Sequence, residues 1–312
     1  MSDRKHRVVI ALGHKALGTT LPEQQKAAAI AAKAIADYIE KDCEVIVTHS
    51  NGPQVGMIRN AMNEYHKNHP EYTATPMAIC SAMSQGFIGY DLQNAISYEL
   101  LSRGISKGIV SLPTRVIVDP YDEAFYEPTK IIGHLMNKAE ADEEEARGNH
   151  ITEVEGGYKR IVASPKPLDI IEIDAIKTLL SSGQAVIAAG GGGIPVLMQG
   201  HALKGASAVI EKDLTAGLLA TLVEADELVF LTGEKYVCRH FGTPAETPIS
   251  GMTVAEAKAD IESKAFGDKA DGTVLPKIIA AVDFVGDDKN KKAVIAKMED
   301  DGTLTGGTII KA

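Results

Sequence analysis

The stretch AVIAAGGGGIPV at residues 185–196 constrains the fold more than any other part of the chain. Its apolar start predicts a buried strand, and four glycines, Gly190 to Gly193, follow before Ile194-Pro195 closes the turn. Glycine loses the most backbone freedom on folding, so four in succession at the end of a strand need a reason. One reason is a backbone that approaches a ligand closely and presents N–H groups to an anion; the other is a flexible turn. We favour the ligand, because α/β proteins bind ligands where parallel strands end.

Apolar runs and helical patterns alternate along most of the chain. The runs predict buried strands over residues 7–12, 44–49, 108–112, 115–118, 185–189, 208–210, 227–232 and 292–295. The helical patterns cover residues 22–41, 54–65, 77–103, 174–182, 211–224, 253–262 and 275–285, with a glycine interruption expected at Gly86 and Gly89. This alternation predicts βαβ units and a parallel sheet, into which both halves of the chain can be joined.

Residues 119–163 differ in composition and sequence pattern from the rest of the chain. They contain several prolines, the acidic run Glu140 to Glu145 and a hairpin pattern around Gly156-Gly157. We expect an insertion or a small protruding subdomain here, and we interpret the acidic run as the solvated face of a helix.

Composition narrows the class of protein. The 312 residues suffice for a large core, and the net charge of −10 argues against a general binder of nucleic acid or of anionic membranes. The three cysteines, Cys43, Cys80 and Cys238, are far apart and fit no zinc spacing, so we expect free thiols in a reducing compartment. No apolar run approaches the ~18 residues of a membrane span, and the apolar run near the N-terminus is too short for a signal peptide. We therefore expect a soluble cytoplasmic protein.

Three predicted strands end in loops that contain glycine, at Gly13, at Asn51-Gly52-Pro53 and at Gly190 to Gly193. A pocket at the carboxyl edge of one sheet would collect all three loops. None of them has the spacing of a Walker loop or of a dinucleotide fingerprint, and the chain has no G-x-S-x-G elbow or H-E-x-x-H motif. His49 follows a buried strand, where a ligand contact and a structural role are equally compatible with the sequence.

Lysines near turns provide a second signal. Lys130 follows Pro128-Thr129, while Lys212 and Lys277 lie at the predicted starts of two helices. The N-terminus of a helix is already positive, so a lysine there is better explained by an anion nearby. Phosphoryl transfer requires such positive charge and little covalent help from the protein.

These features together resemble carbamate kinases of the amino acid kinase superfamily, over essentially the whole chain. The segments that carry the resemblance are VIALG at 9–13, THSNGPQVG at 48–56, QGFIGY at 85–90, DPYDEAFYEPTK at 119–130, VASPKP at 162–167, the glycine run, AVIEKD at 208–213 and GTVLPK at 272–277. The resemblance implies a three-layer α/β fold with an open, mainly parallel sheet of ~8 strands, in a single domain over 1–312 with a protruding subdomain at 119–165. It also implies a homodimer and reversible phosphoryl transfer between carbamoyl phosphate and ADP, giving ATP, with Mg²⁺.

The resemblance also implies roles for individual residues. Lys130, Lys212 and Lys277 correspond to the lysines that handle the phosphoryl group, and Asp213 to the aspartate that orients them. The carbamoyl side would be formed by the loops that contain Gly13, His14, Lys15, Ser50, Asn51, Gly52, Gly190, Gly191 and Gly192. The nucleotide side would include Thr232, Gly233 and Tyr236, together with Lys212 and Lys277.

Several positions depart from the family pattern. His14-Lys15 replaces a usual Gly-Asn pair, Ser50 stands at a usual glycine, and Glu211 at a frequent aspartate. Gly233-Glu234 replaces a common Asp-Val, and Leu275 a common glycine. We hypothesise that Lys15 is a fourth phosphate contact. Two alternatives stay open: a kinase of another small carboxylate, and a non-catalytic homologue that binds a nucleotide or carbamoyl phosphate.

Overall fold

A computed structural model describes residues 4–13, 17–72, 74–267 and 274–312. Its centre is an eight-stranded sheet with the order β15-β17-β16-β12-β1-β2-β9-β3. The strands are β1 (Arg7–Leu12), β2 (Glu44–His49), β3 (Ile109–Ser111), β9 (Ala185–Ile187), β12 (Glu227–Thr232), β15 (Gly251–Thr253), β16 (Lys292–Met298) and β17 (Leu304–Lys311). Every neighbouring pair is parallel except β16 and β17. The predicted mainly parallel sheet is therefore confirmed, and both halves of the chain contribute to it.

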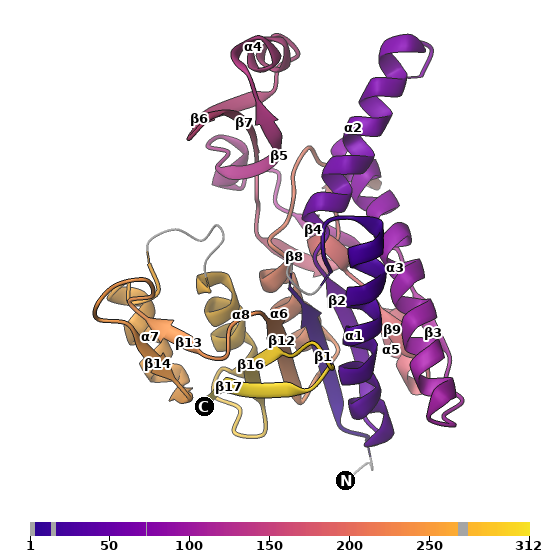
Figure 1. Ribbon diagram of the computed structural model, residues 1–312, viewed down its shortest axis with the longest axis vertical. Coiled ribbons are helices and arrows are strands. Elements are labelled where there is room, and N and C mark those ends of the chain that lie inside the picture. The colour runs from indigo at the N-terminus through magenta and orange to yellow at the C-terminus, as the bar shows by residue number, and fades with distance from the viewer. Residues whose placement is uncertain (1–3, 14–16, 73, 268–273) are drawn as a thin grey trace.

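Helices cover both faces of this sheet (Figure 1). The helices are α1 (Leu21–Glu40), α2 (Gly52–Asn68), α3 (Met77–Ser102), α4 (Lys138–Ala146), α5 (Ile173–Ser181), α6 (Lys212–Leu222), α7 (Val254–Glu262) and α8 (Leu275–Val285). Side chains of β1 alternate between the two layers, because successive residues of a strand point to opposite faces. Val8, Ile10 and Leu12 pack in the cluster that contains α1 and α3, whereas Val9 and Ala11 pack in the cluster that contains α6 and α8. This strand, which is apolar from Val8 to Leu12, thus lies between two cores, as expected for a parallel sheet covered on both sides.

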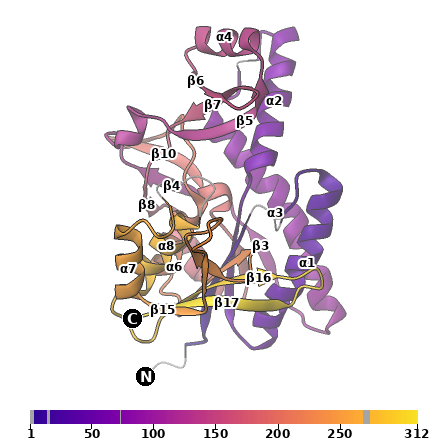
Figure 2. The ribbon, with the colours of Figure 1, turned by 60° about the vertical axis from the view of Figure 1, so that its left-hand side comes forward.

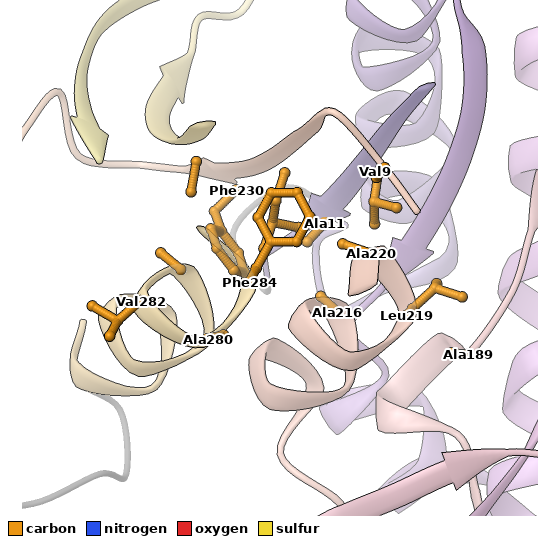
Figure 3. Packing of buried hydrophobic residues seen from close by; sticks show 14 of the residues in the cluster. Val9, Ala11, Ala189, Ala216, Leu219, Ala220, Phe230, Ala280, Val282 and Phe284 are labelled. Carbon is orange, nitrogen blue, oxygen red and sulfur yellow. The ribbon is translucent and has the colours of Figure 1, made fainter. Parts of the chain in front are cut away.

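The second of these cores joins the sheet to α6 and α8. Figure 3 shows Val9 and Ala11 of β1 and Phe230 of β12 facing Ala216 and Ala220 of α6 and Phe284 of α8. The two helices approach so closely that a Cβ atom at Gly217 would lie 3.0 Å from the Cβ and carbonyl oxygen of Ala280. This dense packing fixes the N-termini of α6 and α8, where Lys212 and Lys277 lie.

Two smaller sheets extend from the central one. One has the order β11-β10-β4-β8, formed by β4 (Arg115–Val118), β8 (Pro167–Ile170), β10 (Ile194–Gln199) and β11 (Ala202–Gly205). The other has the order β5-β7-β6, formed by β5 (Lys130–Met136), β6 (His150–Val154) and β7 (Gly157–Val162). With α4 it projects from the body beside α2 (Figures 1 and 2). We name β5, β6, β7 and α4 the protruding unit; the exact boundaries of the predicted subdomain stay a prediction.

Several local expectations were wrong. Ile194-Pro195 does not close a turn but begins β10, where Pro195 pairs with Val116 of β4. The helix over residues 77–102 is continuous, and Gly89 instead provides close packing, because a Cβ there would lie 2.1 Å from Ser111 Oγ. Residues 208–210 form no strand beyond an isolated bridge between Ala208 and Ala163. The strand β17 at the end of the chain, the hairpin of β13 (Val237–Arg239) with β14 (Thr247–Ile249), and β15 were not anticipated.

The acidic run was interpreted correctly. It forms most of α4, in which only Ala141 is buried. The hairpin predicted around Gly156-Gly157 joins β6 to β7. No helix among the described residues is both long enough and apolar enough to cross a membrane.

Candidate active site

The glycine run follows β9 and adopts backbone conformations that other residues rarely take. The φ angles of Gly191, Gly192 and Gly193 are 67°, 87° and 92°. Added Cβ atoms would lie 2.3 Å from His49 Nε2 at Gly190, 2.1 Å from Asn51 Nδ2 at Gly191, and 2.3 Å from the Ile210 carbonyl oxygen at Gly192. At Gly193 the Cβ would lie 2.2 Å from Val116 Cγ2. Each glycine is therefore required by a different neighbour, and the run is a closely packed junction rather than a flexible turn.

Only part of the run presents N–H groups. The N–H groups of Gly192 and Gly193 donate to the carbonyl oxygens of Ala189 and Gly190, both at 3.1 Å. Within the described parts of the chain, the N–H groups of Gly190 and Gly191 have no such acceptor. An anion at this turn would be bound through these two groups, while Gly192 contributes its backbone shape.

Buried polar side chains hold the run in place. Gln85 of α3 donates from Nε2 to the Gly190 carbonyl oxygen at 2.9 Å and accepts from the Thr114 N–H at 2.8 Å. Thr48 Oγ1 donates to the Ala189 carbonyl oxygen at 3.0 Å, and Thr215 Oγ1 of α6 to that of Gly192 at 3.0 Å. Gln85 is only 3 % exposed, and a buried amide with satisfied bonds specifies one geometry. The glycine run is thus joined to α3, β2 and α6.

The loops after β1 and β2 lie at the same edge of the sheet. The Ser50 N–H donates to the Leu12 carbonyl oxygen, and the Gly13 N–H to the Leu231 carbonyl oxygen, both at 3.1 Å. Asn51 precedes α2, and its Nδ2 donates to Ser84 Oγ of α3 at 2.9 Å. Gly52 begins α2, so the positive end of this helix dipole lies beside the glycine run. His14 and Lys15 lie outside the described residues.

Two of the predicted lysines share one buried carboxylate. Asp213 Oδ2 accepts from Lys277 Nζ at 2.8 Å, and its Oδ1 accepts from Lys212 Nζ. Asp213 is 3 % exposed. Burial would raise the pKa of this carboxyl, but the two ammonium groups outweigh burial and hold the pKa below its ordinary value. Asp213 therefore stays ionised and fixes two lysines that start two different helices.

Lys130 lies in a separate ion pair. It begins β5 of the protruding unit, and its Nζ donates to Glu211 Oε2 at 2.8 Å. Glu211 is the residue before α6, so this contact connects the protruding unit to the helix that carries Lys212 and Asp213. Three ammonium groups are thus grouped with the carboxylates of Asp213 and Glu211. A phosphoryl group is the kind of ligand that lysines at two helix N-termini attract.

His49 lies below this cluster and is 1 % exposed. Its Nδ1 lies 2.9 Å from the Ser50 carbonyl oxygen, an acceptor, so Nδ1 carries the proton. Burial lowers the pKa of His49 to about 4, with the charge of Lys212 adding to the effect against the Ser50 hydrogen bond. A neutral imidazole is therefore packed against Gly190 and leaves the charge of the lysines undisturbed.

The residues predicted for the nucleotide side follow β12. Thr232 ends this strand, one residue after Leu231, which pairs with Leu12 of the parallel strand β1, and is thus at the same edge of the sheet. Its Oγ1 accepts from the Glu234 N–H at 3.1 Å and forms a tight turn through Gly233. Tyr236 is half-buried beyond the turn, with its ring 5.8 Å from Lys235 Nζ.

The structure therefore brings most of the predicted site together. Lys212, Lys277 and Asp213 are in direct contact, Lys130 reaches the same helix start, and Asn51 and His49 contact the glycine run. Sequence reasoning did not identify Gln85, Thr215 or Glu211 as contributors. A glutamine within an apolar helix beside two glycines is the signal that could have identified Gln85. The roles of the individual residues stay predictions.

Comparison with known proteins identifies the family. A sequence model described as "Amino acid kinase family" matches residues 6–297, and the chain belongs to this family. It is 46% identical over 290 residues to the "Carbamate kinase-like protein YqeA" of Escherichia coli K12, covering 93% of each chain. It is 42% identical to "Carbamate kinase 1" of Enterococcus faecium, covering 97% of each. The structure matches the carbamate kinase of Giardia lamblia bound to AMP-PNP with a TM-score of 0.88 and 32% identity, covering 98% of this chain and 99% of that one.

Proposed function

We propose that this protein catalyses reversible phosphoryl transfer between carbamoyl phosphate and ADP, giving ATP and carbamate. The observation that carries the proposal is the buried Asp213 carboxylate with Lys212 and Lys277, placed beside the glycine run and the start of α2. Full-length relatives named carbamate kinase support the choice of substrate.

In the direction of ATP formation, an oxygen of the ADP β-phosphate attacks the phosphorus of carbamoyl phosphate. The bond from phosphorus to the carbamoyl oxygen breaks, and carbamate leaves with the electron pair. Lys212 and Lys277 then face the equatorial oxygens, where negative charge is spread in the transition state. Since carbamate is already anionic, no general base is needed in the reverse direction. The buried imidazole of His49 is neutral and takes no proton at neutral pH, which agrees with a reaction that has no general base.

The nucleotide is supported by the Giardia lamblia relative, which was solved with AMP-PNP. We propose that Mg²⁺ enters with the nucleotide phosphates, where it would neutralise charge on the bridging oxygens. Both oxygens of Asp213 accept from lysines, whose positive charges oppose a cation at this carboxylate. The residues at this edge fit a metal that is held mainly by the substrate.

One alternative is a homologue without this activity, favoured by His14-Lys15 in the first loop and by the qualified name of the Escherichia coli relative. The other is a kinase of another small carboxylate in the same family. The three lysines and the protruding unit speak for carbamate. Our hypothesis that Lys15 contacts phosphate is tested by Lys15→Met, and unchanged turnover and nucleotide affinity would refute it.

A coupled assay tests the proposed reaction directly. Purified protein is mixed with ADP, Mg²⁺ and carbamoyl phosphate, and ATP is followed against a reaction that lacks protein. We expect ATP formation well above the spontaneous background. ATP at the background level would eliminate the proposed reaction, and formation only with acetyl phosphate or another acyl phosphate would favour the second alternative.

We also propose a homodimer that forms through α3. Five large apolar side chains of this helix are at least 41% exposed, and their spacing returns them to one stripe: Ile79, Met83, Tyr90, Tyr98 and Leu101. Light scattering coupled to gel filtration should give twice the chain mass, and Tyr98→Glu with Leu101→Glu should give the monomer.

A cytoplasmic location remains our expectation, and the unpaired Cys43 and Cys80 are compatible with it.

A further inference from the structure

Two buried polar residues hold the glycine run from outside: Gln85 of α3 and Thr114, which lies between β3 and β4. Gln85 is 3% exposed and Thr114 is fully buried. Gln85 Oε1 accepts from the Thr114 N–H at 2.8 Å, and its Nε2 donates to the Gly190 carbonyl oxygen at 2.9 Å. Because an N–H donor occupies the amide oxygen, the side chain fits in one orientation only, with Nε2 toward the run.

The residue before the run shows how strongly its surroundings determine the backbone. Ala189 has a φ of 53°, a left-handed conformation that is unfavourable for a residue with a Cβ atom. Thr114 Oγ1 accepts from its N–H at 2.9 Å, and Thr48 Oγ1 donates to its carbonyl oxygen at 3.0 Å. Beyond the run, the Thr114 carbonyl oxygen accepts from the Ile194 N–H at 2.8 Å. Both ends of the run are therefore held by side chains and backbone from other segments, which override local preference.

Gln85 acts on the middle of the run, at the peptide that joins Gly190 to Gly191. The carbonyl group of one residue and the N–H of the next lie in one plane and point in opposite directions across a trans peptide. Since the Gly190 carbonyl group points toward Gln85, the Gly191 N–H points away from it, and it has no backbone acceptor among the described residues. Gly191 is also the one glycine of the run that is not buried. The N–H that a ligand can reach is thus the one whose direction Gln85 determines.

The glycines themselves make this control necessary. A peptide between two glycines meets no Cβ atom on either side, so it can turn over at little steric cost. The Gly193 N–H also donates to the Gly190 carbonyl oxygen at 3.1 Å, but this bond belongs to the turn and is lost if the turn changes shape. Gln85 donates instead from α3, a helix that Ile88 and Leu92 anchor in the core beside the central sheet. It therefore provides a fixed reference outside the turn.

We propose that Gln85 is a positioning residue for phosphoryl transfer, which aims the Gly191 N–H at an oxygen of carbamoyl phosphate. The inference rests on the proposed function. Gln85 does not reach the substrate itself, because its amide is buried and engaged by Thr114 and Gly190. The effect falls on carbamoyl phosphate because Gly191 lies against Asn51 at the start of α2, whereas the residues predicted to bind the nucleotide follow β12.

The test compares Gln85→Met with Gln93→Met. Gln93 lies about two turns later in α3, and its Nε2 donates to the Ile109 carbonyl oxygen of β3 at 2.8 Å. Each replacement removes an amide of the same helix that donates to a backbone carbonyl group, but only Gln85 contacts the glycine run. For Gln85→Met we expect the KM for carbamoyl phosphate to rise about 10- to 100-fold, with the KM for ADP nearly unchanged, because a donor to a charged oxygen is misdirected. Gln93→Met should leave both values near those of the wild type.

Gln85→Glu separates the direction of the peptide from the size of the side chain. A carboxylate still accepts from the Thr114 N–H but cannot donate to the Gly190 carbonyl oxygen, whereas a protonated carboxyl group can. Burial raises the pKa of a carboxyl group, so protonation is expected within an accessible range of pH. Relative to the wild type, the KM of this variant for carbamoyl phosphate should fall toward the normal value as the pH is lowered from about 9 to about 6. A raised KM ratio that stays constant over this range would assign the loss to altered packing and overturn the inference.

A second measurement does not depend on turnover. In protein with isotopically labelled glycine, inorganic phosphate should shift the NMR signal of the Gly191 amide in the wild type and in Gln93→Met, and much less in Gln85→Met. If the wild type makes no ATP, the proposed function fails, and this titration still decides whether Gln85 aims the N–H at an oxyanion. An unmoved Gly191 signal in the wild type, or equal KM values for Gln85→Met and Gln93→Met, would overturn the inference. If Gln85→Met does not fold, Gln85→Glu at high pH provides the same comparison.

Discussion

The two lysine–carboxylate arrangements at the site differ in burial and in what they connect. The side chains of Asp213, Lys212 and Lys277 are 4%, 10% and 18% exposed, and they belong to two helices packed on one core. Those of Lys130 and Glu211 are 24% and 22% exposed, and they connect the protruding unit to the body. A buried charge group fixes geometry before the substrate arrives, whereas a more exposed pair is worth less and can exchange partners more easily. We therefore propose that the site combines a fixed pair of lysines with a third lysine that can move from Glu211 toward a phosphoryl group.

The largest expected effect is on turnover when a fixed lysine is removed. Lys212→Ala should reduce kcat by about 10³-fold, because it removes positive charge from the transferring phosphoryl group. Asp213 keeps Lys277 as its partner, so the loss of folding stability should be small by comparison. Kinetics and urea unfolding measure the two effects, with Lys177→Ala of α5 as the control. A variant that unfolds would show that Lys212 is structural.

Removal of the shared carboxylate tests whether burial distinguishes the two arrangements. Asp213→Asn leaves two ammonium groups without their anion, and breaking a buried pair in this way costs on the order of 3 kcal/mol. We expect the midpoint of urea unfolding to fall markedly and kcat to fall with it, since both lysines lose their orientation. A stability close to that of the wild type would mean that water already screens this cluster.

His49 gives a pH dependence to the buried region. Its folded-state pKa of about 4 lies below the unfolded value of 6.5, so the unfolded chain binds the proton first as the pH falls. The contribution to stability is complete above pH 6.5 and is lost between pH 6.5 and 4, by roughly 3 kcal/mol at most. Urea unfolding of the wild type and of His49→Gln at pH 7.5 and 5 measures the difference. Parallel pH profiles for the two proteins would contradict the buried neutral imidazole.

The sequence predicted correctly the strands and helices whose bounds are set by local patterns. Strand β12 and helix α8 have the predicted bounds, because an apolar run and a proline near the helix start are local signals. The predictions were wrong where contacts between distant parts of the chain determine the local structure. Pro195 was expected to close a turn, yet it lies in β10 between β4 and β11, and its carbonyl oxygen accepts from the Ala206 N–H at 2.9 Å. The final strand β17 exists because β16 and β15 provide partners on both sides.

In the candidate site, too, local patterns were predictable and contacts between distant residues were not. Residue types and turn positions identified the lysines, but not which carboxylate each one meets. Lys212 and Asp213 are adjacent in sequence, whereas Lys277 reaches Asp213 across 64 positions and Lys130 reaches Glu211 across 81. The glycine run was expected to bind a ligand through its N–H groups, and the structure adds a second requirement. Its glycines also make room for His49, Asn51, Ile210 and Val116.

The smallest effect is expected at the Lys130–Glu211 pair, and it tests the comparison most sharply. Glu211→Gln should cost about 1 kcal/mol of stability, because an ion pair that water still reaches contributes little. Since Glu211 competes with the phosphoryl group for Lys130, its neutralisation should lower the KM for carbamoyl phosphate by a few fold while kcat changes little. Glu211→Asp, which keeps the charge, is the matched control and should preserve the wild-type KM. A loss of stability as large as that of Asp213→Asn would show that both arrangements are structural, and the distinction between a fixed and an exchangeable cation would fail.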